Sequence, residues 1–354
     1  MLIPRCIHFF MMNPLYFGNH YIDFRHKSQE KADIVSAEKI CYDRNQRSDL
    51  MIDFQRLDLD RKAQYDAILR NCGQRGCEYS FVNLFLWGRQ KAAFLGNRLA
   101  VLSQFDRKSV YPFPVGEGDL KETIDTIIHD AQSRGLPCYL TSLSKEDCET
   151  VESLYPGRFT FHEDRDVWDY VYNINDLADL KGRKFQKKRN HLNRFEEAHP
   201  NCQYLPLDES TRVAAFQMLG QWYRDRAKID KEHDFHLEQL AIQRAFAFQK
   251  DLEIEGLVLV EDGKVLAFAM GSRLNETTFD IHFEKALEDV DGAYPAINRG
   301  FARYLREKYP ELLYLDREDD LGLEGLRKAK LSYNPAFMVE KYWARLWEAE
   351  DDHF

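Results

Sequence analysis

Residues 256–284 read GLVLVEDGKVLAFAMGSRLNETTFDIHFE, and this stretch decides the fold. Three runs of mainly apolar residues, 256–261, 265–272 and 278–284, each have the length of a strand and are separated by short polar turns. The first turn is Asp262-Gly263, a pair that readily adopts the positive φ angles of a tight hairpin. The stretch therefore predicts a three-stranded antiparallel meander.

Helices and strands surround this meander. Before it, the pattern predicts a strand at 169–173, a basic helix at 184–197, a strand at 202–206 and helices at 210–226 and 237–249. After it, the pattern predicts a helix at 295–308, a strand at 312–316, a helix at 323–330 and a strand at 336–343. This order of elements is that of GNAT acyltransferase folds, so we predict an α+β fold class.

Residues 51–165 also mix helices and strands. The predicted elements are a strand from Met51, a helix at 60–71, a helical patch at 79–87, a hairpin at 92–104, a helix at 120–133, a strand at 137–141, a helix at 144–154 and a strand at 159–162. We therefore expect two tandem GNAT-like domains, 51–165 and 166–354. The first would be a shorter, degenerate copy, although no strict internal repeat supports a duplication and this step rests on analogy.

The first 50 residues show no sustained period. Residues 27–49 are mostly polar and charged, which disfavours a place in a core. Because the first clear pattern opens at Met51, we predict that residues 1–50 are a disordered or mis-annotated N-terminal extension and that translation could start at Met51. The segment lacks the apolar core and cleavage site of a signal peptide.

Composition and charge exclude several classes of protein. The 354 residues are 44% hydrophobic, and 49 Lys and Arg face 59 Asp and Glu, so a uniformly basic coat for nucleic acid or an anionic membrane is excluded. No run approaches the roughly 18 apolar residues of a spanning helix. The seven scattered cysteines fit reduced thiols and predict a cytoplasmic protein. Cys72 and Cys77 have no second pair to complete a zinc site, and we expect no metal.

The third strand of the meander carries candidate catalytic residues. Because side chains alternate along a strand, Asp280, His282 and Glu284 share one face. A carboxylate or imidazole there could accept a proton from an attacking amine or hydroxyl, and crowding would move the pKa values towards neutrality. The alternative is a solvated strand face, or ion pairs with Arg273 or Arg299.

A basic helix is the candidate anion site. Seven Lys and Arg fall within positions 181–194 without a single acid. At helical spacing Lys184, Lys187, Lys188 and His191 form one stripe, and Phe185, Arg189 and Leu192 form another. Such a stripe can neutralise phosphates, and we assign donor binding to Lys187, Lys188, Arg189 and Asn190. The alternative is a solvated face paired with acids elsewhere in the chain.

The third candidate region follows the strand at 312–316. Four acids, Asp316, Glu318, Asp319 and Asp320, precede a helix whose last turns carry Arg327, Lys328 and Lys330. The helix dipole explains part of this pattern. It does not explain Arg317 among four acids, and we assign substrate binding to Arg317, Asp319 and Lys330. The acids could alternatively bind the α-ammonium of an aminoacyl group.

The loop that would bind coenzyme A departs from the usual pattern. GNAT enzymes hold a pyrophosphate with backbone amides of a glycine-rich loop, whereas residues 287–294 place Glu288, Asp289 and Asp291 there. Like charge disfavours coenzyme A. Hydrolase, zinc-peptidase and P-loop motifs are absent from the sequence.

The chain resembles the bacterial family of phosphatidylglycerol lysyltransferase C-terminal-like domains over residues 51–345. The resemblance rests on YSFVNLFLW (79–87), KKRNH (187–191), FDIHFEKA (279–286), GAYPAIN (292–298) and REDDLGLEGLRKAK (317–330). It implies kinship with lysyl-phosphatidylglycerol synthases and Fem-type transferases, which pair two GNAT-like domains and use aminoacyl-tRNA as donor. The sequence lacks the membrane helices of the synthases, so the resemblance leaves the acceptor open.

The resulting hypothesis is an aminoacyl or acyl transfer enzyme. Lys187, Lys188 and Arg189 would hold phosphates of aminoacyl-tRNA, Glu284 or His282 would assist the acceptor, and Arg317 with Asp319 would orient the substrate. No cofactor is needed. Two alternatives stay open: an acetyl-CoA-dependent N-acetyltransferase, and a non-catalytic binding protein on the same fold.

Overall fold

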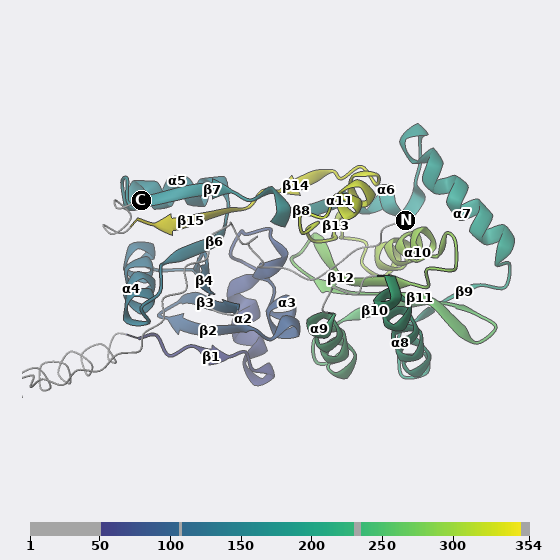
Figure 1. Cartoon of the computed structure of the whole chain (residues 1–354), viewed down its shortest axis with the longest axis horizontal. Coiled ribbons are helices and arrows are strands. Elements are labelled where there is room, and N and C mark those ends of the chain that lie inside the picture. Colours follow the sequence, from purple (N-terminus) through teal and green to yellow (C-terminus); the bar gives the residue numbers. More distant parts are fainter. Residues whose placement is uncertain (1–50, 106–107, 230–234, 348–354) are drawn as a thin grey trace, which may run out of the picture.

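The computed structural model describes residues 51–105, 108–229 and 235–347. The prediction for residues 1–50 lies outside these ranges. Two sheets follow one another along the long axis of the molecule, each covered by helices (Figure 1). The α+β fold with two GNAT-like units is confirmed.

The first sheet has eight strands in the order β1-β2-β3-β4-β6-β15-β7, with β5 paired to β3. Its strands are β1 (Gln55–Arg56), β2 (Gln90–Leu95), β3 (Arg98–Phe105), β4 (Lys108–Pro112), β5 (Val115–Gly116), β6 (Tyr139–Leu143), β7 (Phe159–Glu163) and β15 (Tyr342–Leu346). The helical segments of this half are η1 (Leu59–Arg61), α2 (Lys62–Leu69), η2 (Cys77–Tyr79), α3 (Phe81–Trp87), α4 (Leu120–Ser133), α5 (Lys145–Leu154) and η3 (Arg165–Val167). The side chain of Ser144 caps α5 by accepting a hydrogen bond from the Asp147 amide.

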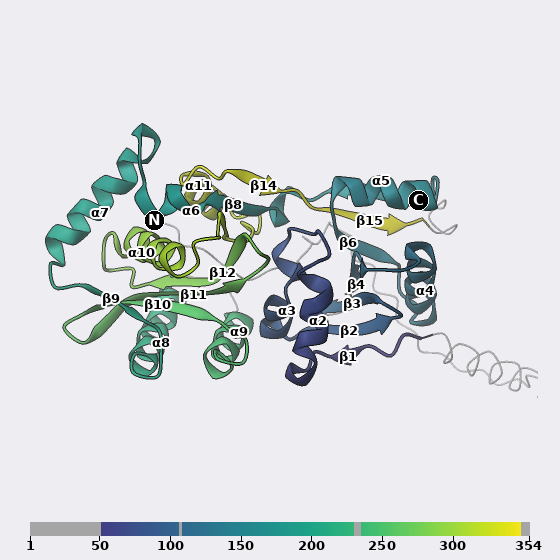
Figure 2. The same cartoon turned by 180° about the vertical axis from the view of Figure 1, so that it is seen from behind.

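The second sheet has seven strands in the order β14-β8-β13-β12-β11-β10-β9. Its strands are β8 (Asp169–Asn173), β9 (Gln203–Pro206), β10 (Glu255–Glu261), β11 (Lys264–Arg273), β12 (Thr278–Ala286), β13 (Tyr314–Asp316) and β14 (Phe337–Val339). Its helical segments are α6 (Ile174–Asp179), η4 (Arg183–Phe185), α7 (Gln186–Ala198), α8 (Arg212–Ile229), α9 (His236–Ala247), α10 (Ala293–Lys308) and α11 (Glu324–Leu331). Helix α10 lies on one face of the meander, and α8 and α9 lie on the other (Figure 2).

The predicted meander is confirmed. Strands β10, β11 and β12 pair antiparallel in sequence order, and β13 joins β12 in parallel after the α10 crossover. Asp262 (φ 49°) and Gly263 (φ 77°) both have positive φ, as the hairpin between β10 and β11 requires. Strand β12 thus lies inside the sheet, with neighbours on both edges.

The predicted strand at 336–343 is corrected to two strands in different sheets. Strand β14 pairs with β8 in the second sheet, and β15 then enters the first sheet between β6 and β7. The physical reason is that β15 pairs antiparallel on both edges and buries Ala344 and Leu346 in the hydrophobic core that packs against the first sheet. A boundary at 165/166 therefore does not separate the two sheets.

A single large core also joins the two halves. It contains Tyr79, Phe81 and Leu84 from the first half together with Tyr172 and Phe246 from the second. A hydrogen bond also crosses the joint, because Arg244 of α9 donates from Nη1 to the carbonyl oxygen of Leu86 in α3 at 2.7 Å. The two halves therefore pack against each other through a shared hydrophobic core and are not joined by a linker alone.

Candidate active site

The polar face of β12 meets the end of β13 and helix α10. Glu284 Oε1 accepts a hydrogen bond from Arg317 Nη2 at 3.0 Å, and Glu284 Oε2 accepts one from Asn298 Nδ2 at 3.0 Å. The side chains of Glu284 and Arg317 are only 9% and 11% exposed. The carboxylate is therefore held at both oxygens.

Helix α7 contributes one lysine to this group. Lys188 Nζ lies 3.7 Å from the centre of the Tyr333 ring, and Arg317 Cζ lies 5.0 Å from the centre of the same ring. Burial and the nearby Arg317 charge lower the pKa of Lys188 to about 8, and Glu284 opposes this shift. We call Glu284, Asn298, Arg317, Lys188 and Tyr333 the transfer cluster.

The other predicted donor-binding residues lie elsewhere on α7. Lys187 and Asn190 are exposed. The guanidinium of Arg189 is engaged in local hydrogen bonds: it donates to the carbonyl oxygens of Leu180 and Gly182 and to Gln186 Oε1. Of the four residues, Lys188 is the one that reaches the polar face of β12.

Asp280 and His282 lie deeper than Glu284, in a second group. His282 Nδ1 is 3.3 Å from Asp280 Oδ2 and 3.5 Å from Glu318 Oε1. The exposed fractions of Asp280, His282 and Glu318 are 0%, 2% and 6%. Burial, and then the charges of Glu318 and Asp316, raise the pKa of Asp280 well above its usual value, which is the direction that the sequence predicts.

Lys330 and Asp319 also lie inside. Lys330 Nζ donates to the carbonyl oxygens of Arg317, Glu318 and Asp319, so it fixes the turn after β13. Asp319 is 5% exposed, and burial raises the pKa of its carboxyl well above the usual range. Lys330 therefore shapes the turn that presents Arg317, and Asp319 is buried in this turn. Neither of them lies on the surface.

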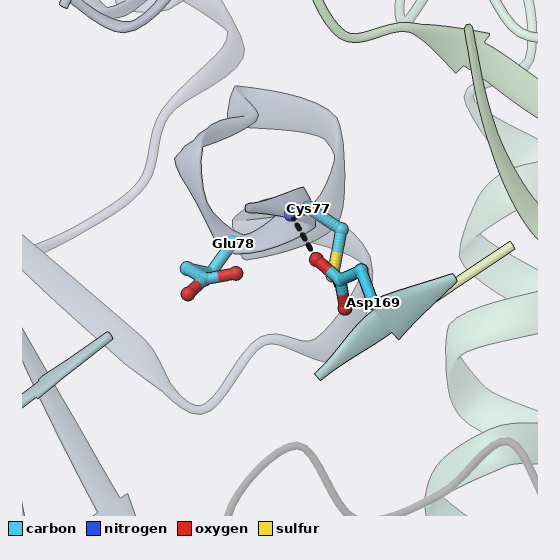
Figure 3. Close-up of side chains that lie close together, drawn as sticks. All are labelled: Cys77, Glu78 and Asp169. Atoms are coloured by element: carbon cyan, nitrogen blue, oxygen red, sulfur yellow. Dashed lines mark hydrogen bonds between the residues drawn. The ribbon is translucent and has the colours of Figure 1, made fainter. Parts of the chain in front are cut away.

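A third buried group joins the two halves and was not predicted from the sequence. Cys77 and Glu78 of η2 face Asp169 of β8, and the Cys77 amide donates to Asp169 Oδ2 at 3.0 Å (Figure 3). Lys341 Nζ lies 2.7 Å from Glu78 Oε2 and 2.8 Å from Asp169 Oδ2. Burial and Asp169 raise the pKa of the Cys77 thiol well above its usual value. This shift favours the protonated thiol.

Sequence reasoning also missed Asn298 and Tyr333. Asn298 lies in the GAYPAIN stretch, where an amide within an otherwise apolar helix face is the only signal. Tyr333 follows α11 with nothing in its neighbourhood to mark it. Their roles depend on contacts with Glu284 and Lys188, which are distant in the sequence.

Fold and site define the class: two GNAT-like sheets in tandem, with a held carboxylate and two cations on the second. The chain belongs to the family described as phosphatidylglycerol lysyltransferase, C-terminal, whose model matches residues 69–345. This confirms the resemblance seen in the sequence. Family and fold together indicate an acyltransferase of the phosphatidylglycerol lysyltransferase type.

Solved structures have the same architecture. A conserved protein of unknown function from Bacteroides thetaiotaomicron is 36% identical, with a TM-score of 0.79 over 84% of this chain and 100% of that one. L-PGS from Bacillus licheniformis is 15% identical, with a TM-score of 0.60 over 84% and 95% of the two chains. FemX is 9% identical, with a TM-score of 0.54 over 84% and 98%. The last two likenesses concern the fold.

One curated relative also matches. An uncharacterized protein of Mycoplasmoides gallisepticum is 24% identical over 209 residues, which are 59% of this chain and 65% of that protein. The match thus spans less than two thirds of the relative. In the described part of the chain, no helix is both long enough and apolar enough to cross a membrane.

Proposed function

We propose that this chain transfers an aminoacyl group from aminoacyl-tRNA to an amine or hydroxyl acceptor. One observation carries the proposal: the basic helix α7 turns Lys188 inward, so that its charge interacts with Glu284 and Arg317. The helix thereby connects an outer basic surface to a polar group on the central strand. An enzyme that takes an acyl group from a polyanion needs both features.

The outer surface of α7, together with the segment just before it, suits a phosphate backbone. Lys187 is exposed, and Lys181 and Arg194 have side chains that are 83% and 61% exposed. Their salt bridges to Asp179 and Asp291 are of the weak, solvent-screened kind and could yield to phosphates. Binding of tRNA here would weaken steeply as salt rises.

The transfer cluster can supply the chemistry. Glu284 accepts the proton of the attacking amine or hydroxyl, while the new bond forms to the ester carbonyl carbon. The ammonium of Lys188 and the guanidinium of Arg317 stabilise the negative charge on the carbonyl oxygen. The bond to the ribose oxygen of tRNA then breaks, and this oxygen receives the proton. We assign this role to Glu284 rather than to His282, because the Glu284 side chain is 9% exposed and that of His282 only 2%.

Two assays test the proposal. Filter binding with mixed aminoacyl-tRNA at low and moderate salt measures donor binding, and release of labelled amino acid to a mixture of amine and hydroxyl acceptors measures transfer. We expect Glu284→Gln to bind tRNA normally and to lose transfer. Lys187→Ala should weaken binding and leave the rate at saturating donor unchanged.

Other outcomes would contradict the proposal. Absence of tRNA binding removes the donor, and stabilisation by acetyl-CoA in a thermal shift assay would favour the N-acetyltransferase alternative. Binding without turnover in the wild-type chain for any donor and acceptor would favour a non-catalytic binding protein.

A further inference from the structure

The deeper group on β12 has an arrangement that the transfer cluster does not use. Asp280 and His282 come from β12 and Glu318 from the turn after β13, and one donor atom of each lies within 4.8 Å of the other two. All three side chains are at least nine-tenths buried. Acyl transfer at Glu284 gives them no role.

Hydrogen bonding within this group is weak, because the hydrogen bond between His282 Nδ1 and Glu318 Oε1 is long, at 3.5 Å. His282 Nδ1 faces two carboxylates at 3.3 and 3.5 Å, beyond the usual 2.7–3.2 Å of a nitrogen-to-oxygen hydrogen bond. One ring N–H can serve only one of them. By contrast, ligand atoms placed tetrahedrally at about 2.0–2.1 Å from a zinc ion are roughly 3.3–3.4 Å apart. The two separations from His282 Nδ1 are close to those of ligands around a shared cation, and the donor atoms of Asp280 and Glu318 lie within 4.8 Å of each other.

Asp280 adds an independent observation. Its two carboxylate oxygens are buried and accept no hydrogen bond from any residue of the described ranges, and Oδ2 points at His282. The Oδ2 atom of the neighbouring Asp316 is likewise buried and accepts no hydrogen bond from the described residues. Buried carboxylates without donors carry a large desolvation cost, which a cation within the group would offset.

The surroundings hold the donor atoms as metal ligands are usually held. Ser272 Oγ lies 2.8 Å from His282 Nε2, which leaves Nδ1 for the centre of the group. Asn83 Nδ2 donates to Glu318 Oε1 at 3.2 Å. Outer contacts of this kind orient ligating imidazoles and carboxylates.

The buried group in Figure 3 provides a contrast. There Glu78 and Asp169 already have a cation, because Lys341 Nζ lies within 2.8 Å of both carboxylates. A lysine therefore forms ion pairs with one acidic group in this protein, whereas Asp280 has the imidazole of His282 as its ion-pair partner and feels the charge of Lys341 more weakly than those of the nearby acids.

We propose that Asp280, His282 and Glu318 form a binding site for a divalent transition-metal cation, with Zn²⁺ as the best match to one imidazole and two carboxylates. From the sequence alone no metal is expected, and the grouping of these three side chains in space leads to the opposite conclusion. The cation would neutralise the buried acids and tie β12 to the turn that presents Arg317. The proposal is independent of the acyl donor, since it concerns occupancy and stability.

The first experiment uses the full-length chain without an affinity tag. Metal is removed with a chelator, Zn²⁺ is titrated by calorimetry, and thermal unfolding is followed with and without Zn²⁺. We expect one tightly bound equivalent and a rise in Tm of several degrees. Asp280→Asn and His282→Gln should abolish both effects, and Ser272→Ala should weaken binding about 10- to 100-fold.

The half-buried pair His199–Glu261, with Nδ1 and Oε2 2.7 Å apart, provides the matched control. His199→Gln should leave Zn²⁺ binding unchanged, whereas equal loss in this variant would show adventitious histidine binding. Cys77→Ser should also bind normally. If the β12 variants do not fold, the wild-type chain is titrated with Co²⁺ and its visible absorption is recorded. Absence of ligand-field bands would then overturn the proposal. Absence of Zn²⁺ binding in the wild type, or undiminished binding in Asp280→Asn, overturns it as well.

Discussion

The ammonium of Lys188 lies 3.7 Å from the centre of the Tyr333 ring. The same ring borders Arg317, so one aromatic side chain lies beside two cations that would otherwise repel each other. Cations over an aromatic ring are stabilised by about 0.5–2 kcal/mol each, more when water is excluded. Tyr333 therefore holds the positive side of the transfer cluster in place.

Replacing this ring tests the relationship. Tyr333→Leu removes the aromatic face and should slow acyl transfer at least about tenfold, with a loss of about 3 kcal/mol in the free energy of unfolding. Tyr333→Phe keeps the face and should stay close to wild type in both. Chemical denaturation and steady-state rates check the pair, and equal loss in the two variants would contradict a role for the ring.

Transfer should depend on pH through Lys188. Its pKa is about 8 in the folded chain, so the ammonium that stabilises the oxyanion is lost as pH rises through 8. We expect kcat to fall above this pH in the wild type. Lys188→Met should lower kcat about 10²- to 10³-fold and remove the decrease of kcat above pH 8. If kcat of Lys188→Met still decreased above pH 8, the titrating group would be a residue other than Lys188.

Stability should respond in the opposite sense. The folded pKa of Lys188 lies below the ordinary value of 10.5, so between about pH 8 and 10.5 the unfolded chain binds more protons. The free energy of unfolding of the wild type, relative to Lys188→Met, should therefore rise across this window. Below pH 8 the penalty of the buried charge is complete. Urea denaturation of both chains at several pH values measures the difference.

Removing Lys341 should damage the joint between the halves. Lys341→Met leaves Glu78 and Asp169 buried without this counter-ion and should cost about 3–5 kcal/mol. Lys181→Met changes the same residue type at a side chain that is 83% exposed and should be nearly neutral. Similar denaturation midpoints for the two variants would argue against a structural ion pair.

The crossing strand β15 can be tested at Ala344, which lies between β6 and β7. Ala344→Pro removes an amide hydrogen and introduces a clash, and it should cost about 3 kcal/mol or more. Ala344→Gly keeps the amide and should cost about 0.5–1 kcal/mol. If proline were tolerated as well as glycine, the strand would not be part of the sheet.

Local patterns in the sequence were sufficient for most of the fold. The β10–β12 meander follows from three apolar runs of strand length and from the Asp262-Gly263 turn. The expected common face of Asp280, His282 and Glu284 does not form one group: Glu284 contacts Arg317 and Asn298, whereas His282 contacts Asp280 and Glu318 where the β11–β12 register shifts. The place of β15 does not follow from local patterns, because its partners lie about 180 residues or more away along the chain in β6 and β7. A run of apolar residues does not specify which sheet edge it joins.

The site was predictable only in part. The basic stretch indicated α7, but the choice of Lys188 over Lys187 depends on how Phe185, Leu192 and Phe195 pack, which sets the rotation of the helix. The buried pairs are also non-local: Asn83 and Glu318 are 235 positions apart. Their partnership follows from the way the halves dock.

Because β15 is the middle of three neighbouring strands in the first sheet, the polypeptide is interlocked. A fragment ending at residue 165 would keep β6 and β7 but leave the slot between them vacant, with the ladder edges of both strands open to water or to another chain. To study the amino-terminal half by itself, residues 342–346 must therefore be attached to it through a linker. Alternatively, the two halves are co-expressed, so that β15 of the carboxy-terminal half can pair with β6 and β7.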